Sequence, residues 1–312
     1  MKIRKLSREE FTAWDDTVAA SPQASLFHTT SWNQMLCETA SKNWTCSYIV
    51  CEKKGGILGG ILLHSREGNS NLPMFGYNGP FFHPEINYQE NQKTVPGYEV
   101  HTELLNEISS LTRQAHIRNQ PEIWNTRAYS FNKWQVRTNY THILDCSNKE
   151  ELWKKISNPV SEEVKEQRFI IADITNDPMQ KSPLYLKNSP AFNWKNSKNE
   201  FMKRVQWLKE RGLCRIMQLM KNTGEKLASA LFILSNENKT IYLHKSILPS
   251  NAAESDAFSL LIWHSYLSFG AGFERMDLGA SNTMSISRIK DSIGGKLTPF
   301  FITNNKKYFF QS

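Results

Sequence analysis

The stretch MDLGASNTMSISRIKDSIGGKLTPFF, residues 276–301, places two cations and a pair of glycines between two apolar segments. Its pattern predicts a strand end, a polar loop, a short helical turn with Arg288 and Lys290, a break at Gly294-Gly295 and another strand. A lysine on such a turn can bring its ammonium near an anion while the backbone stays close. Arg288 would point elsewhere on the turn, so one of the two cations should face a ligand. The alternative is that Lys290 is a solvated surface lysine.

Length and composition restrict the class of protein. The 312 residues are 39% hydrophobic and 12% aromatic, which is ample for packed cores, and the length favours two domains. No stretch reaches the roughly 18 apolar residues of a membrane span. Residues 1–16 lack the apolar segment of a secretory signal. The five cysteines form no C-x-x-C pair and indicate neither a disulfide framework nor a zinc site. We therefore expect a cytoplasmic protein without a metal.

The net charge of +8 permits partners that carry phosphates, such as nucleotides, nucleic acid or lipid head groups. The Lys and Arg residues are dispersed, and no basic run reaches about five residues, so DNA is not an expected partner. The alternative is that the basic surface only keeps the protein soluble.

The order of predicted elements repeats once along the chain. The first half predicts a helix at 31–40, a hairpin at 46–65, a strand at 74–82, a helix at 101–117 and a short strand at 122–128. The second half predicts a helix at 200–212, a hairpin at 214–235, a strand at 240–248, a helix at 253–273 and a short strand at 275–281. Glycines at 55–56 and at 224 would supply the positive φ of the two hairpin turns, and Gly212 suits a left-handed helix end.

This repetition predicts two copies of one mixed α/β unit. We place them at residues 1–145 and 146–312, with a final hairpin at 299–312 that could complete the first unit. Residues 173–199 are rich in Asn, Lys, Ser and Pro and predict a long loop.

Three motifs, taken in order, resemble those of a known family. SLFHTTSWNQML, residues 25–36, resembles an opening segment in which a Trp follows a Phe, here as Phe-x-x-x-x-Trp. LPMFGYNGPFF, residues 72–82, resembles a Tyr-x-Gly-Pro strand end. The stretch from Met276 resembles a closing Asp-Leu-Gly, then Phe-Lys-x-x-Phe-Gly, then strand. Together they resemble the Fem-type peptidoglycan aminoacyltransferases and the related CelD-like bacterial acyltransferases, which carry a duplicated GNAT acyltransferase fold.

The resemblance implies two tandem GNAT-like domains around a central cleft. It also implies an acyltransferase that moves an acyl or aminoacyl group to an amine of a cell-envelope precursor or sugar. Acyl-coenzyme A or aminoacyl-tRNA would be the co-substrate, and the acceptor would be a phosphate-bearing small molecule or a cell-wall precursor. The rival hypothesis is a catalytically degenerate GNAT-like module that binds a glycan or a protein partner.

This sequence departs from the family in three places. The family's Phe-Lys is Ile289-Lys290 here, and its second Phe is Ile293. The basic helix that usually follows the first domain is represented by PVSEEVKEQRF, residues 159–169, which begins acidic. The coiled-coil arm of tRNA-using members is absent, so a tRNA donor is disfavoured without being excluded.

The resemblance implies that Lys290 is catalytic, where it would meet a substrate phosphate or the reacting carbonyl. Arg288 is a substrate-binding candidate on the same turn. Tyr77 and Asn78 match the family's Tyr-x-Gly-Pro and would line the acceptor site, although a structural turn explains them equally well.

Acyl transfer to an amine also requires a proton acceptor. Asp277 ends a strand that should point at the site, and the alternative is a carboxylate that caps the turn before Gly279. His244 is the second candidate, and the alternative is a hydrogen-bonded core histidine. Tyr242, two residues earlier on the same strand, is a further substrate-binding candidate.

The loop before the helix at 253–273 is where a GNAT enzyme carries its Gly-rich pyrophosphate loop. Here the glycines are missing, and Asn251 and Glu254 predict a capping box instead. Backbone amides at Ser250 and Asn251 remain the candidates for holding a cofactor pyrophosphate. The acidic residues Glu254 and Asp256 would oppose it, so we expect weak coenzyme A binding.

Overall fold

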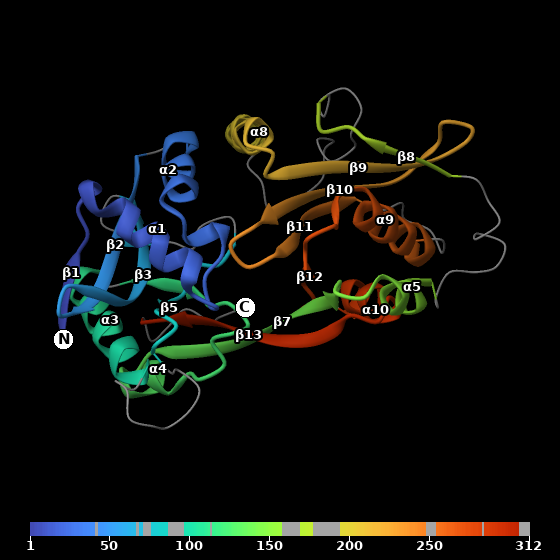
Figure 1. Cartoon of the computed structure of the whole chain (residues 1–312). Coiled ribbons are helices and arrows are strands. Elements are labelled where there is room, and N and C mark those ends of the chain that lie inside the picture. The colour runs from blue at the N-terminus through green and yellow to red at the C-terminus, as the bar shows by residue number, and fades with distance from the viewer. Residues whose placement is uncertain are drawn as a thin grey trace. The chain divides into compact units, whose positions relative to one another are not determined.

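The computed structural model describes residues 1–40, 43–66, 69–70, 76–86, 97–112, 114–157, 169–176, 194–247, 254–282 and 284–305 (Figure 1). The chain forms two compact units. Unit 1 is Met1–Asn139 with Pro299–Ser312, and unit 2 is Tyr140–Thr298. The second unit therefore begins earlier than the expected start at residue 146.

Unit 1 contains, in chain order, β1 (Lys2–Lys5), the 3-10 turn η1 (Arg8–Glu10), α1 (Phe11–Ala20), the 3-10 turn η2 (Leu26–His28), α2 (Thr30–Thr39), β2 (Trp44–Lys53), β3 (Gly56–Arg66), β4 (Asn69–Ser70), β5 (Phe81–Phe82), α3 (Gly97–Leu111), β6 (His116–Arg118) and α4 (Arg127–Phe131). Strands β1, β2 and β3 pair antiparallel in that order, and β4 and β5 both pair with β3.

Alternate residues of β2 enter the two cores on opposite faces of this sheet, as the two-residue period of a strand requires. Ile49 packs with Val100 and Leu104 of α3. Val50 packs with Trp14 and Val18 of α1. The sheet of unit 1 is thus covered by α3 on one face and by α1 on the other.

Unit 2 contains β7 (Gln135–Asp145, from Tyr140 onward), α5 (Lys149–Ser157), β8 (Phe169–Asp173), α8 (Trp194–Glu210), β9 (Cys214–Lys221), β10 (Lys226–Ser235), β11 (Thr240–Ile247), α9 (Glu254–Phe269), β12 (Arg275–Ala280), α10 (Met284–Ser292) and β13 (Lys296–Asn304, up to Thr298). Its strands follow the spatial order β7-β12-β11-β10-β9-β8, in which β11 and β12 are parallel and the other neighbouring strands are antiparallel. The core of the unit joins Phe232, Phe258, Leu261 and Met276 between this sheet and α9.

Both units follow the predicted order of helix, hairpin, strand, helix and short strand, and each continues with a short helix. Gly212 has a φ of 67° just after α8, and Gly224 has a φ of 86° in the β9–β10 turn, so both glycine predictions are confirmed. In the β2–β3 turn the positive φ falls on Lys54 and Gly55, one residue before the expected Gly-Gly pair. A two-residue turn of this kind needs positive φ at both central positions.

Three predicted elements of unit 1 differ in position, and of the strand expected at 74–82 the described residues form only β5, Phe81–Phe82. The helix expected to reach residue 117 ends at Leu111, and the strand expected at 122–128 is β6, His116–Arg118. Strand β6 pairs with β13, and Ile117 enters the core there, which fixes the strand earlier than the local pattern suggested. In the predicted loop at 173–199, α8 already begins at Trp194, and residues 177–193 lie outside the described residues.

None of the helices in the described residues has both the length and the apolar character needed to cross a membrane.

Candidate functional site

A cavity opens in unit 2 where the parallel pairing of β11 and β12 ends. The two strands pair Thr240 with Arg275, Ile241 with Met276 and Tyr242 with Asp277. Directly afterwards β11 carries a bulge, because Phe232 of β10 pairs with Leu243 while the adjacent Leu231 pairs with Lys245. A bulge bends a strand and breaks its pairing. The cavity beyond it has a volume of about 400 Å³ and is lined by Leu243, His244, Lys245, Ser246, Phe258, Leu278, Gly279, Ala280, Ile289 and Lys290.

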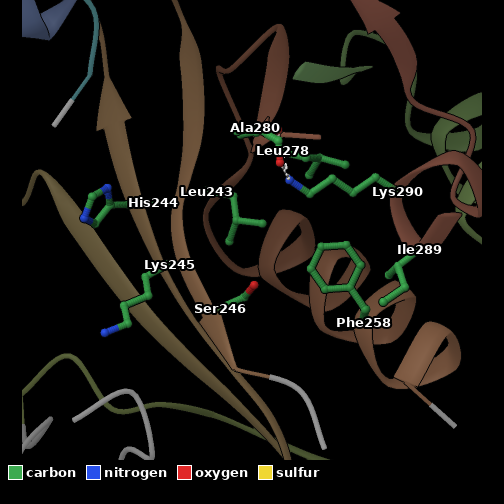
Figure 2. Close-up of a pocket in the computed structure, with 10 residues that line it drawn as sticks. Leu243, His244, Lys245, Ser246, Phe258, Leu278, Ala280, Ile289 and Lys290 are labelled. Carbon is green, nitrogen blue, oxygen red and sulfur yellow. Dashed lines mark hydrogen bonds between the residues drawn. The ribbon is translucent and has the colours of Figure 1, made fainter. Parts of the chain in front are cut away.

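Four apolar side chains form much of the cavity wall. One comes from each of the elements β11, β12, α9 and α10. They are Leu243, Leu278, Phe258 and Ile289. Figure 2 shows Leu243, Phe258 and Ile289 facing the space into which Lys290 extends. This wall suits an apolar ligand group held next to the Lys290 amine.

Lys290 reaches the cavity from α10. Its side chain is 7% exposed, and its Nζ donates hydrogen bonds of 2.9 Å to both Gly279 O and Ala280 O at the end of β12. Burial disfavours the charged form and lowers the pKa of Lys290 to about 8, while the charge of Asp277 acts in the opposite direction. A solvated surface lysine is therefore not what the structure contains.

Glycines lie in the turns that precede and follow the segment carrying Lys290. Gly279 has a φ of 74°, and a Cβ there would lie 3.2 Å from Leu243 O. Gly294 also has a φ of 74° and follows the end of α10. Left-handed φ is accessible to glycine at little cost and ends a helix in the usual way. The glycines predicted around Lys290 thus let the chain turn sharply on either side of it.

Asp277 is buried close to Lys290. Its carboxylate accepts hydrogen bonds from the Thr141 hydroxyl and from Gly279 N, the latter at 2.8 Å. The second bond is the turn-capping arrangement named as the alternative role for this residue. Asp277 also favours the charged form of Lys290, so it links the turn to the amine.

His244 and Lys245 line the same cavity but point away from Lys290 (Figure 2). The His244 ring stacks with Phe201 of α8 at 6.4 Å between centroids, and Lys245 Nζ lies 5.4 Å from the centre of the Phe201 ring. Partial burial lowers the pKa of Lys245. Tyr242 is buried, and its hydroxyl accepts a 2.8 Å hydrogen bond from Asn238.

Tyr77 and Asn78 lie in unit 1 and are both buried. The ring of Tyr77 meets that of Phe300 edge-on at 5.8 Å. The side chain of Asn78 accepts from Arg118 N at 2.8 Å and donates to His116 O at 3.3 Å, which ties the turn to β6. Their assignment to an acceptor site stays a prediction.

The remaining candidates fall outside the cavity or outside the described chain. Arg288 is exposed on α10, whereas Lys290 is buried two residues later. Ser250 and Asn251 lie outside the described residues. Among the residues that the structure does describe, no group of His, Cys, Asp and Glu side chains could hold a metal ion.

Sequence reasoning missed His142, Thr141, Ser281 and Asp291. His142 and Thr141 alternate on β7, and their partners are more than a hundred residues away along the chain. Asp291 sits beside Lys290 in the motif itself, and that adjacency was the signal available in the sequence.

Comparison with protein-family models and with curated proteins gives no match. Solved structures do match over nearly the whole chain. The crystal structure of FemX has a TM-score of 0.61 at 11% identity and covers 96% of this chain and 97% of its own. A tandem GNAT protein from the clavulanic acid biosynthesis pathway has a TM-score of 0.56 at 9% identity, covering 97% of both chains. A GNAT-family acetyltransferase from Colwellia psychrerythraea has a TM-score of 0.53 at 12% identity, covering 97% of this chain and 99% of its own.

These similarities establish the fold. The chain has a mixed α/β fold like that of tandem GNAT proteins, and the fold class expected from the sequence motifs is confirmed.

Proposed function

We propose that this protein transfers an acyl or aminoacyl group to an amine, and that the cavity between β11, β12, α9 and α10 is where the reaction occurs. The observation that carries the proposal is the buried Lys290 amine, which faces an apolar cavity at the end of the parallel strand pair. The fold supports it, since one structural neighbour bears the name acetyltransferase and another the name FemX.

The transfer needs one new C–N bond and the loss of one C–S or C–O bond. The acceptor amine attacks the acyl carbonyl, the carbonyl oxygen becomes negative, and the amine must lose a proton as the leaving group departs and takes one up. An enzyme that orients donor and acceptor therefore needs a group that can stabilise the oxyanion or move the proton.

Lys290 can serve in either capacity. Two of its N–H bonds are directed at Gly279 O and Ala280 O. The third position on Nζ is an N–H in the ammonium form and a lone pair in the neutral form. With its pKa lowered to about 8, the side chain is present in both forms near neutral pH. The ammonium would donate to the oxyanion, and the neutral amine would accept the proton of the acceptor.

The walls indicate the kind of group transferred. Leu243, Phe258 and Ile289 suit an apolar acyl chain or an apolar aminoacyl side chain next to the reacting carbonyl. Acyl-coenzyme A and aminoacyl-tRNA are both retained as donors, and the net charge of +8 favours either phosphate-bearing molecule. A phosphate-bearing cell-wall precursor is the acceptor class that we propose.

The test begins with thermal melting of the full chain in the presence of acetyl-coenzyme A, a longer acyl-coenzyme A, an aminoacyl-tRNA and a nucleotide-linked cell-wall peptide. A true ligand at about 100 times its dissociation constant adds about 2.7 kcal/mol of stability. Each stabilising donor is then incubated with the peptide, and the acylated amine is measured by mass spectrometry. Binding of a ligand without product under any donor would favour the degenerate binding module instead.

We expect Lys290→Ala to reduce turnover about 10- to 150-fold, the range for loss of one charge-assisted hydrogen bond. Lys290→Arg should recover only part of it, because a planar guanidinium does not replace a compact ammonium and cannot become neutral. Lys296→Ala is the matched control, since Lys296 is exposed six residues further along the same motif. Equal turnover in Lys290→Ala and Lys296→Ala would contradict the role of Lys290.

A further inference from the structure

The imidazole of His142 joins three segments of unit 2. Its side chain is fully buried on β7. Its Nδ1 lies 2.7 Å from the Ser281 hydroxyl in the segment between β12 and α10. Its Nε2 lies 2.6 Å from a carboxylate oxygen of Asp291 on α10. An ionised carboxylate only accepts, so the contact at Nε2 is an N–H donated to Asp291.

Asp291 is held on both oxygens. Its second oxygen accepts from the Ser287 hydroxyl one helical turn earlier at 3.1 Å, and its first belongs to the contact with His142. The carboxylate therefore connects one face of α10 to β7. Lys290 is the neighbouring residue and fixes the adjacent face of α10 to the end of β12.

The chain also leaves space for this contact. A Cβ on Gly295 would lie 3.1 Å from Cβ of His142 and 3.5 Å from its ring carbon Cδ2. The second glycine of the Gly294-Gly295 pair thus allows the segment after α10 to pass over the His142 side chain.

We propose that His142 and Asp291 are positioning residues, which hold α10 against β7 so that the Lys290 amine stays on the two carbonyls at the end of β12. The importance of this contact for turnover rests on the proposed function. Its effect on the position of Lys290 does not depend on that function.

A nucleophilic role for the same residues fits the geometry poorly. Ser281 is 7% exposed and is outside the set of described residues that line the cavity. A serine nucleophile must reach a carbonyl carbon, which needs open space in front of its hydroxyl. The Asp291 carboxylate, by contrast, is 56% exposed, so among Ser281, His142 and Asp291 the solvent-accessible group is the carboxylate and not the serine hydroxyl.

The direction in which the pKa of Lys290 shifts when Asp291 is removed distinguishes a positioning role of Asp291 from a purely electrostatic one. The low pKa of Lys290 comes first from burial, and Asp277 is the charged group that opposes the shift. If Asp291 acted on Lys290 only by its negative charge, its removal would lower the pKa of Lys290 further or leave it unchanged. If Asp291 holds α10 in place, its removal lets water reach Lys290 and raises the pKa toward the ordinary 10.5.

The experiment titrates Lys290 without any substrate. The full-length protein is labelled with trace acetic anhydride from pH 6 to pH 11, and the modified Lys290 peptide is quantified by mass spectrometry to give the midpoint. The variants are Asp291→Ala, Asp291→Asn and His142→Gln. The matched control is Glu274→Gln, because Glu274 is 63% exposed and forms a 2.7 Å contact with Lys239 elsewhere in unit 2.

We expect the midpoint near 8 in the parent and in Glu274→Gln, and at least about one unit higher in Asp291→Ala. Asp291→Asn keeps an oxygen that can accept from His142 and should retain most of the lowered midpoint. Because His142 is buried and its variant could unfold, Asp291→Ala decides the outcome. An unchanged or lower midpoint in folded Asp291→Ala overturns the proposal. A raised midpoint in a protein that transfers no acyl group supports the positioning role and counts against the proposed function.

Discussion

At the scale of single residues, the structure changes what Lys290 is expected to contribute. The sequence left open a solvated lysine, whose replacement would barely affect folding. The observed side chain is buried and satisfies two backbone carbonyls. Its removal takes one buried donor from each carbonyl, and although Gly279 O still accepts from the Thr141 hydroxyl at 3.0 Å, loss of a buried hydrogen-bond partner typically costs about 1–3 kcal/mol. Function and stability are therefore coupled at this position.

The lowered pKa of Lys290 makes a stability prediction with a definite sign. The folded state loses this proton near pH 8 and the unfolded state near pH 10.5, so the unfolded chain binds more protons between these values. Stability contributed by Lys290 therefore rises with pH in that window. We expect the parent to gain about 2 kcal/mol relative to Lys290→Met between pH 8 and pH 10, measured as the difference in unfolding free energy by urea denaturation.

The comparison with Lys290→Met cancels the other titrating groups, which are common to both proteins. Lys296→Met, at an exposed lysine of the same motif, controls for the loss of a lysine in general. A parent-minus-Lys290→Met difference that stays flat from pH 8 to pH 10 would show that Lys290 titrates as an ordinary lysine.

At the scale of elements, the end of the β11–β12 ladder creates the site. The bulge at His244 and the left-handed Gly279 both occur where the parallel pairing stops. Helix α10 then returns Lys290 to the carbonyls of the strand that precedes it. The cavity, the amine and its acceptors thus depend on one sharp change of direction after β12.

Gly279→Ala tests this dependence. An L-residue at a φ of 74° costs about 1–2 kcal/mol, and the new Cβ would meet Leu243 O at 3.2 Å on the cavity wall. We expect a loss of stability in that range together with weaker ligand binding. Gly224→Ala is the control, because Gly224 has a φ of 86° with no atom within 4 Å of its Cβ position. It should lose similar stability and bind normally. Equal ligand affinity in the two variants, measured by calorimetry, would show that the conformation of Gly279 does not affect ligand binding.

The elements themselves were largely predictable, and the contacts between them were not. Helical and two-residue periodicity indicated α8, β9 and β10, and Gly212 and Gly224 marked the turns that join them. The motif beside Gly294-Gly295 pointed to Lys290. The partner of His142 could not be found this way, because it lies 149 residues further along the chain and only the folded sheet brings the two together. The burial of Lys290 likewise depends on where β12 ends, which no local pattern specifies.

At the scale of the whole molecule, the chain passes between its two units twice. The division falls inside β7, after Asn139, and again inside β13, before Pro299. A boundary at residue 145, drawn from the repeated order of elements, removes the part of β7 that belongs to unit 2. That part pairs Leu144 with Met276 and Ile143 with Asp277.

This shared strand predicts how fragments of the second unit will behave. A fragment of residues 146–298 keeps β11 but lacks the part of β7 that pairs antiparallel with β12, and it loses the buried Leu144 side chain, whose burial alone is worth about 1.5–3 kcal/mol. It also loses Thr141 and His142, the partners of Asp277 and Asp291. We expect residues 135–298 to unfold cooperatively in urea and residues 146–298 to do so at a much lower midpoint or not at all. In the full chain, Leu144→Ala should cost about 2–5 kcal/mol, whereas Leu267→Ala, at a side chain that is 45% exposed, should cost far less. Equal unfolding midpoints for the two fragments, together with equal effects of the two leucine substitutions, would show that unit 2 is complete without β7.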